Sequence, residues 1–352
     1  MPLYLGELVK DGKPTYKGKI PDKATSGLDF YDGVRLAADS LNAMGYSIDV
    51  YVHDIADAEN TVEKLAKRKT LDSSDLIIGA VQSQQIPVVA EIAKKNKINF
   101  ISTISPSDGG VSNNSYFTLL QPSLQSHCEW IMDQVKNKAH KNEPIIFYRT
   151  GNTNDESAFK YLTAGPKEKW NKLSCNTIPT QQQLGSFFDS TKTNVIIISI
   201  IDYSYSEKIL QDLYTYFPNY RFEVYGMPSW RSMPSLRKPD AYPNVAVYIT
   251  TPFYYDVSTP GGQKLSAKYK SVMGGTRPGE FVYRGYETMF WYSYLLRKYG
   301  TIFNEKMSDN SVSPFTKFEV KPQWDDKDDL LYNENKHIYL YRYQSSSFTV
   351  VQ

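Results

Sequence analysis

The chain has 352 residues, of which 22% are charged and 14% are aromatic, and its formal net charge is +2. This length exceeds what one hydrophobic core usually serves, so we expect two domains or lobes. Lys and Arg alternate with Asp and Glu instead of clustering, which removes the electrostatic footprint of a nucleic-acid-binding protein. We therefore expect no nucleic-acid partner.

The first part of the chain alternates short apolar runs with amphipathic segments, which is typical of a parallel α/β sheet. The strand at residues 98–102 ends in hydroxyl residues, and a hydroxyl also follows the strand at 76–79 within a few positions. The expected elements are strands at 3–9, 48–53, 76–79 and 98–102, and helices near 29–43 and 57–69, with a further helix between the last two strands.

The second part restarts the alternation, which predicts a second lobe. A late helix at 282–299 resembles no part of that alternation, so we expect it to return to the first lobe. The tail at 337–343 changes to a period of two, which predicts a closing antiparallel edge hairpin. The other expected elements are helices at 122–138, 154–170 and around 209–217, and strands at 144–149, 175–178, 195–201, 221–225 and 245–249.

The stretch at 75–107, DLIIGAVQSQQIPVVAEIAKKNKINFISTISPS, is the most informative unit. Loops at the carboxyl ends of parallel strands line ligand crevices in open α/β sheets. The two loops in this stretch offer hydroxyl and amide groups and no evident catalytic group. They therefore favour ligand binding over chemistry.

Other sequence features exclude several classes of protein. No run approaches the roughly 20 apolar residues that span a bilayer, so no transmembrane segment is expected. No signal peptide is visible at residue 1, and a longer precursor remains compatible with a signal or a lipid anchor. The two cysteines, Cys128 and Cys175, exclude a disulfide framework, and the helical stripe around Cys128 predicts a buried thiol.

The sequence contains no motif that indicates an enzyme. The chain contains no phosphate-binding glycine loop, nucleophile elbow or zinc-binding helix signature, and its four histidines are scattered. The acidic run at 325–329 lacks the spacing of a calcium loop, which predicts a solvated turn. We therefore expect neither an enzyme nor a bound cofactor or metal.

Four segments together carry a family resemblance: FYDGVRLAADSLN (30–42), DLIIGAVQSQQIPVVAEIAKKNKINFIS (75–102), YFTLLQPS (116–123) and GYETMFWYSYLLRKYG (285–300). In order and spacing they resemble the type I periplasmic binding protein superfamily, including its branched-chain amino-acid receptors. The chain looks most like the branch found in envelope proteins of the Bacteroidetes type, some of which carry a LysM module. No LysM module is visible here.

The resemblance implies two Rossmann-like lobes with parallel central sheets, joined by a three-strand hinge, with a ligand cleft between them. The lobes would comprise 1–120 plus about 252–313, and 121–251 plus about 314–352. Receptors of this kind hold a ligand carboxylate with hydroxyls of lobe one and an ammonium with an acidic residue of lobe two. Hinge closure would sequester the ligand.

Carried over position by position, the family pattern points to loops after several strands. Ala80 stands where the family usually has Pro, and Gln82 and Gln84 are bulkier than usual, so the first loop departs from the pattern. In lobe two, Arg149 is among the positions that would face the cleft. The expected ligand-binding residues are Gln82, Ser83, Ser102, Thr103, Ser105, Thr150, Asp202, Tyr203, Trp230 and Arg284.

Each candidate also has a simpler structural role. Ser83 and Asp202 both precede helices and are suitable N-caps. Ser102 ends a buried strand. Arg284 could form a surface ion pair, as arginines commonly do.

The resemblance implies an extracytoplasmic, solute receptor-like protein, periplasmic or envelope-anchored, whose ligand is an amino acid, peptide or muropeptide. Its partner would be a membrane permease or an envelope protein. The alternative is an envelope interaction module that keeps the fold but binds a protein or peptidoglycan partner, because the fold alone does not define the function.

Overall fold

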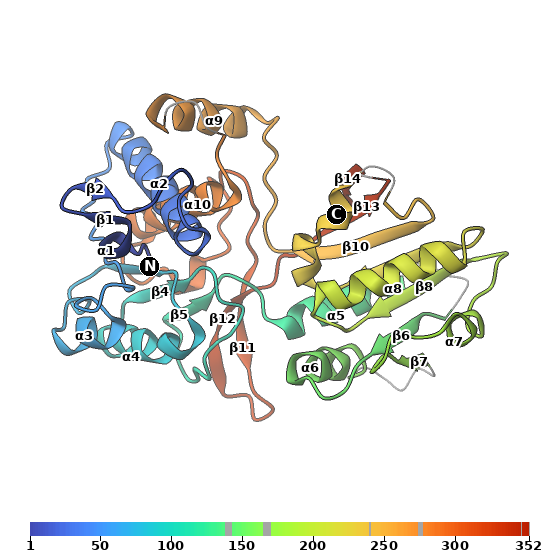
Figure 1. Ribbon diagram of the computed structural model, residues 1–352. Coiled ribbons are helices and arrows are strands. Elements are labelled where there is room, and N and C mark those ends of the chain that lie inside the picture. Colours follow the sequence, from blue (N-terminus) through green and yellow to red (C-terminus); the bar gives the residue numbers. More distant parts are fainter. Residues whose placement is uncertain (138–142, 165–169, 239–240, 274–276, 346, 352) are drawn as a thin grey trace. The chain divides into compact units, whose positions relative to one another are not determined.

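The computed structural model describes residues 1–137, 143–164, 170–238, 241–273, 277–345 and 347–351 (Figure 1). Its residue contacts divide the chain into two units. Unit 1 comprises Met1–Ser123 and Phe253–His337, and unit 2 comprises Leu124–Pro252 and Ile338–Gln352. The chain thus passes three times from one unit to the other.

Unit 1 is built on a five-stranded sheet in the order β11-β12-β5-β4-β3. The neighbours β3, β4, β5 and β12 run parallel, and β11 is antiparallel to β12. All four residues of β4 are buried, the polar Asn99 and Ser102 at its ends as well as Phe100 and Ile101 between them. The strands are β3 (Leu76–Gly79), β4 (Asn99–Ser102), β5 (Phe117–Leu119), β11 (Val320–Trp324) and β12 (Leu330–Asn335).

Two long helices of unit 1, α2 (Asp22–Ala43) and α10 (Glu280–Tyr299), pack closely against each other. A Cβ atom at Gly33 would lie 2.1 Å from the Val282 carbonyl oxygen, and one at Gly285 would lie 2.0 Å from the Phe30 carbonyl oxygen. The two backbones therefore touch where glycine permits it. This contact confirms that the late helix returns to the first unit.

The remaining elements of unit 1 surround the sheet. Residues 325–329 form the turn between β11 and β12, where the Asp325 carboxylate accepts the Lys327 and Asp329 amides. The solvated turn predicted there is confirmed. The other elements are α1 (Leu5–Leu8), β1 (Val9–Lys10), β2 (Lys13–Pro14), α3 (Val62–Lys67), η1 (Ser83–Gln85), α4 (Ile86–Asn96), α9 (Pro260–Met273) and η4 (Asn304–Lys306).

Two predicted strands of unit 1 are wrong. Residues 3–9 form the short helix α1 and the start of β1, because the Asp54 carboxylate accepts the backbone amides of Leu3 and Leu5 at 2.8 Å each. Residues 48–53 form no strand, and Tyr51 is 81% exposed. Their apolar side chains therefore did not indicate a buried sheet position.

The lobe expected from residue 314 onward also needs correction. Residues 314–337 belong to unit 1, because β12 pairs in parallel with β5 and β11 extends the same sheet. Only the tail from Ile338 belongs to unit 2. The sequence showed strand propensity in this region but not its pairing partner.

Unit 2 has a seven-stranded sheet in the order β14-β13-β10-β9-β8-β6-β7. The five strands β10, β9, β8, β6 and β7 are parallel to one another. On the β10 edge, β13 and β14 form an antiparallel hairpin, as predicted from the period of two. The strands are β6 (Ile145–Tyr148), β7 (Asn171–Ser174), β8 (Thr193–Ile198), β9 (Arg221–Gly226), β10 (Val245–Thr251), β13 (Tyr339–Gln344) and β14 (Ser347–Val350).

The strand predicted at 175–178 lies four residues earlier, at β7. Its ladder ends where β6 ends, with Tyr148 opposite Ser174, and the Cys175 amide then donates to the Tyr148 carbonyl oxygen at 2.7 Å. Pairing length, and not local propensity, sets this boundary.

Helices cover the sheet of unit 2. The helix predicted at 154–170 ends at Leu162, and residues 165–169 lie outside the described residues. The helices are α5 (Leu124–Asn137), α6 (Thr153–Leu162), α7 (Gln181–Gly185), α8 (Tyr203–Tyr216), η2 (Pro228–Ser232) and η3 (Pro234–Arg237).

Cys128 and Cys175 are buried free thiols. Burial raises the pKa of each thiol to about 12, so both are inert.

Candidate functional site

In unit 1 the loops that follow β3 and β4 meet at two serine hydroxyls. The Oγ atoms of Ser83 and Ser105 lie 3.1 Å apart, within hydrogen-bonding distance. Their strands are neighbours, with Gly79 opposite Ser102, so both loops leave the same edge of the sheet. This is the edge at which open parallel sheets bind ligands.

The second loop is shaped by its own hydrogen bonds and lies close to the first. The Ser105 hydroxyl accepts the Ser107 amide at 3.1 Å, and the Ser107 hydroxyl accepts the Gly109 amide at 3.1 Å. Gly109 has a φ of +65°, and a Cβ there would lie 2.9 Å from the Ser83 carbonyl oxygen. A glycine is therefore needed for the loop to lie this close to Ser83.

Of the other candidates at this edge, Thr103 and Gln82 form local structural hydrogen bonds and Ser102 does not, and their part in ligand binding stays a prediction. Ser102 is completely buried, and its hydroxyl has no partner among the described residues. The Thr103 hydroxyl donates to the Gly79 carbonyl oxygen at 3.2 Å, which joins the ends of β3 and β4. Gln82 is the N-cap of η1 and forms a capping box with Gln85, so the first loop uses its bulkier residue to start a helix.

Unit 2 gathers polar groups at the carboxyl ends of β6 and β7. Thr150 follows β6, and its amide donates to the Asn176 side-chain oxygen at 2.8 Å, while the Asn176 amide group donates to the Thr150 hydroxyl at 2.7 Å. Both residues are exposed. This reciprocal pair links the loops after β6 and β7 and leaves the residues accessible.

Asp202 is the N-cap of α8. Its Oδ1 atom accepts the amides of Ser204 and Tyr205 and the Ser204 hydroxyl, at 3.0, 3.2 and 2.7 Å. The Ser204 hydroxyl, these amides and the nearby Arg149 lower the pKa of Asp202, so the carboxylate is ionised at neutral pH. Tyr203, the first residue of α8, is half-buried and packs against the core of unit 2.

Two further candidates lie inside the protein. Trp230 is completely buried and its indole donates to the Ile200 carbonyl oxygen at 2.9 Å, so it packs in the core. Arg284 in unit 1 pairs with Glu280 at 2.5 Å, and its guanidinium lies 3.9 Å from the Phe253 ring centre. The ion pair considered for Arg284 is confirmed, although it is largely buried instead of exposed.

Sequence reasoning missed Asp155 and the contacts that organise the edge of unit 2. Asp155 is completely buried and binds the Arg149 side chain, and the Tyr205 hydroxyl donates to the Cys175 carbonyl oxygen at 2.7 Å. Asn152 begins α6 as a cap, which is visible in the sequence. Nothing in the sequence distinguishes Asp155, three residues later, from an exposed helical Asp.

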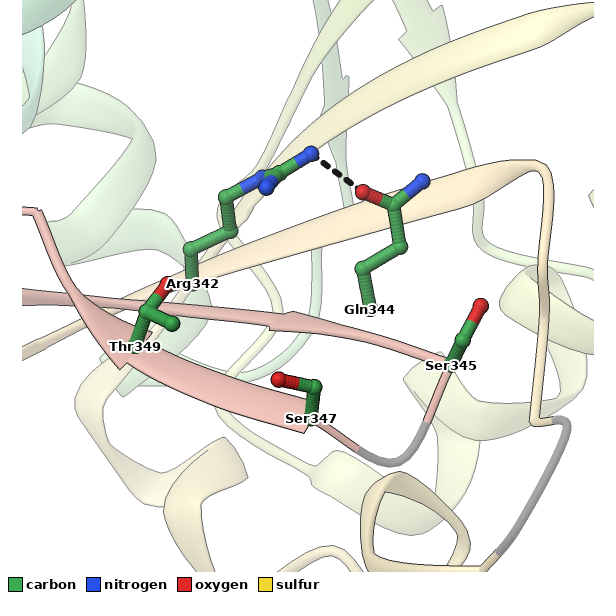
Figure 2. Close-up of a pocket in the computed structure, with 5 residues that line it drawn as sticks. All are labelled: Arg342, Gln344, Ser345, Ser347 and Thr349. Carbon is green, nitrogen blue, oxygen red and sulfur yellow. Dashed lines mark hydrogen bonds between the residues drawn. The ribbon is translucent and has the colours of Figure 1, made fainter.

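A pocket of about 220 Å³ lies on the β13–β14 hairpin (Figure 2). Figure 2 shows the Arg342 guanidinium donating to Gln344, so the one cation of the pocket already has a partner. None of the expected ligand-binding residues lines it. The lining residues are Arg342, Gln344, Ser345, Ser347 and Thr349.

Among the described residues, no group of three His, Cys, Asp or Glu side chains could hold a metal ion. None of the helices in the described part of the chain is long and apolar enough to cross a membrane.

Comparisons with known proteins establish the fold. No family model matches the chain, and no curated protein is significantly similar to it. Among solved structures, a putative branched-chain amino acid ABC transporter from Rhodospirillum rubrum matches with a TM-score of 0.72 at 14% identity, covering 94% of this chain and 96% of that one. The chain therefore has the two-lobe type I periplasmic binding protein fold.

Two other solved structures share this fold. An ABC transporter substrate-binding protein from Desulfitobacterium hafniense, in complex with Leu, has a TM-score of 0.59 at 15% identity, with 92% of this chain and 95% of that one covered. Full-length LpoA from Haemophilus influenzae has a TM-score of 0.58 at 14% identity, and the match covers 94% of this chain but 57% of LpoA. The expected similarity to Bacteroidetes envelope proteins stays a prediction.

Proposed function

We propose that this chain is an extracytoplasmic, solute receptor-like protein that binds a small polar ligand, either amino-acid-like or peptide-like, without chemical conversion. The observation that carries the proposal is the pair of hydroxyls of Ser83 and Ser105, 3.1 Å apart at the carboxyl edge of the unit 1 sheet. The related structure from Desulfitobacterium hafniense, which has the same fold, is in complex with Leu.

The chemistry of the two hydroxyls suits a carboxylate. Each hydroxyl has one donor proton, and in the free protein at most one of the two protons can serve their mutual bond. Hydrogen bonds to a carboxylate are shorter and stronger than those between neutral groups. A ligand carboxylate would therefore replace the mutual bond, and the 3.4 Å contact of the Ser105 hydroxyl with the Ser107 carbonyl oxygen, with two charge-assisted bonds.

Asp202 is the proposed partner of a ligand ammonium. Its Oδ1 atom caps α8, while no bond to Oδ2 occurs among the described residues. The ionised carboxylate is exposed, so its second oxygen is available to a cation. Thr150, which is exposed next to Arg149, belongs to the same proposed contact region.

The resemblance adds two expectations to this proposal. The two units would close on the ligand, and a membrane permease would receive it. Small-angle scattering with and without the ligand tests the first expectation, because closure reduces the radius of gyration.

The main experiment is a thermal-shift screen against amino acids, short peptides and muropeptides, followed by calorimetry. A ligand that binds only the folded protein raises its stability by about 2.7 kcal/mol at a hundred times its Kd. Ser83→Ala combined with Ser105→Ala should weaken the affinity about 100-fold or more, because each of the two lost bonds to a charged group contributes about 1.5–3 kcal/mol. Ser271→Ala is the control, since its hydroxyl bonds only within α9.

The competing function is an envelope interaction module that binds a protein or peptidoglycan partner. One observation favours it: Gln82 caps η1 and is exposed at the loop where receptors of this type carry small residues. If no small molecule changes the melting temperature while one envelope protein or peptidoglycan fragment binds specifically, the receptor proposal should be abandoned.

A further inference from the structure

The guanidinium of Arg149 is held in place by several groups at the carboxyl edge of the unit 2 sheet. Arg149 directly follows β6, and its side chain is 17% exposed. Its Nε and Nη2 atoms both lie 2.7 Å from Oδ2 of Asp155, whose side chain is completely buried. The contact fixes the position of the guanidinium on the rim of the sheet.

Two other groups restrict the same guanidinium. Its central carbon lies 4.7 Å from the centre of the Tyr205 ring, a cation–π distance. The Tyr205 hydroxyl donates to the Cys175 carbonyl oxygen at 2.7 Å, which fixes the ring. Tyr205 is the third residue of α8, so elements from β6, β7 and α8 all define the position of Arg149.

Asp155 connects this pair to the neighbouring strand. Its Oδ1 atom accepts the Ile201 amide at 2.8 Å, three residues after β8 ends. A buried ion pair by itself adds little stability, because desolvation of the two charges offsets their attraction. The arrangement is better explained as orientation of the guanidinium than as a source of folding energy.

Two other carboxylates, those of Glu156 and Asp202, lie nearby, and each uses one oxygen to accept backbone amides. Glu156 accepts the Gly151 amide at 2.7 Å, and Oδ1 of Asp202 caps α8. Asp155 uses only the Nε and Nη2 side of the guanidinium. Within the described residues, no partner approaches its Nη1 atom. An oriented guanidinium edge at a partly exposed position is the geometry that binds carboxylates in a bidentate manner.

We propose that Arg149 is a specificity-determining residue that binds an anionic group of the ligand, with Asp155 as its positioning residue. The ligand class then narrows to amino-acid-like molecules with an additional carboxylate. This inference rests on the proposed function, because it names the charge of the ligand that the protein binds. Fixing the guanidinium before binding reduces the entropy lost when the anion binds.

The test compares glutamate with glutamine, which has nearly the same shape but no side-chain charge. Calorimetry of the full chain should show glutamate binding at least about 10-fold more tightly than glutamine, the effect of about 1.4 kcal/mol of added interaction. Arg149→Gln should abolish this preference. Arg221→Gln is the matched control, because Arg221 begins β9 at the opposite, amino end of the sheet.

A second variant keeps the test valid if Arg149→Gln does not fold. Arg149→Lys keeps the charge opposite Asp155 but lacks the planar fork, so it should fold and should retain only part of the preference. Binding of neutral amino acids with no preference for glutamate, or an unchanged preference in both variants, would overturn this inference and leave the receptor proposal intact. Failure of every amino acid and peptide to bind would overturn both.

Discussion

The hydroxyl oxygens of Ser83 and Ser105 lie 3.1 Å apart, although 22 positions separate the two residues in the chain. The pairing of β3 with β4 brings their loops to one edge, and Gly109 lets the second loop lie against the Ser83 backbone. The candidate site of unit 1 therefore depends on sheet pairing and on one glycine with positive φ. Four further predictions concern other buried contacts of the two units.

Ser102 and Thr103 should respond differently to loss of their hydroxyls. Ser102→Ala should change the free energy of unfolding by less than about 0.5 kcal/mol, because the buried hydroxyl forms no bond that would be lost. Thr103→Val should destabilise the protein by about 1 kcal/mol, since the Gly79 carbonyl oxygen loses a donor. Urea unfolding measures both values. A loss of ligand binding in Ser102→Ala would show that Ser102 contributes to the ligand site.

Gly285→Ala should strongly destabilise unit 1. The added Cβ would lie 2.0 Å from the Phe30 carbonyl oxygen, so α10 and α2 would have to separate, at a cost of roughly 2 kcal/mol or more. Gly261→Ala in α9 is the control, because its nearest neighbour would be 3.6 Å away. Thermal unfolding of both variants decides the matter, and equal melting temperatures would contradict the close helix contact.

Glu287 should make unit 1 less stable as the pH rises. The carboxyl group is completely buried, and burial raises its pKa to about 8, against the opposing effects of Thr316 and Arg284. Between the unfolded value near 4.5 and about 8, the folded protein holds a proton that the unfolded chain has released, so stability falls with rising pH. Each pKa unit corresponds to about 1.4 kcal/mol, so the loss over this window is a few kcal/mol.

The measurement for Glu287 is urea unfolding from pH 5 to pH 8. Glu287→Gln mimics the protonated side chain and can keep contact with the Thr316 amide and hydroxyl, which bind the two Glu287 oxygens at 2.8 and 2.9 Å. The variant should therefore show a flatter pH dependence than the parent protein. The same slope in both proteins would show that Glu287 is ionised in the folded state.

His127 should give the opposite sign in unit 2. Its ring is buried, Nδ1 lies 2.9 Å from the Thr250 hydroxyl, and burial lowers the pKa to about 3. Below pH 6.5 the unfolded chain gains a proton that the folded protein rejects, so stability falls as the pH falls towards 3. Denaturation between pH 4 and pH 7 should show a smaller loss in His127→Gln.

Periodicity in the sequence was sufficient for the elements whose local pattern and packing agree. The apolar run at β3 and the helical spacing of α10 were predicted near their observed bounds, because burial of both follows from short-range patterns. Residues 48–53 carry the same strand propensity, yet they are exposed and form no strand. Propensity describes a residue's fit to a sheet and not the presence of a partner strand.

For the candidate site, the sequence alone determined which loops carry hydroxyls and charges at the ends of strands, since strand and helix alternation is a local property. Only the tertiary structure decided which of these groups are available. It buried Ser102 and Trp230 and paired Ser83 with Ser105. It also placed Asp155 beneath Arg149. These outcomes depend on contacts between residues distant in the chain, and such contacts leave no periodic trace in the sequence.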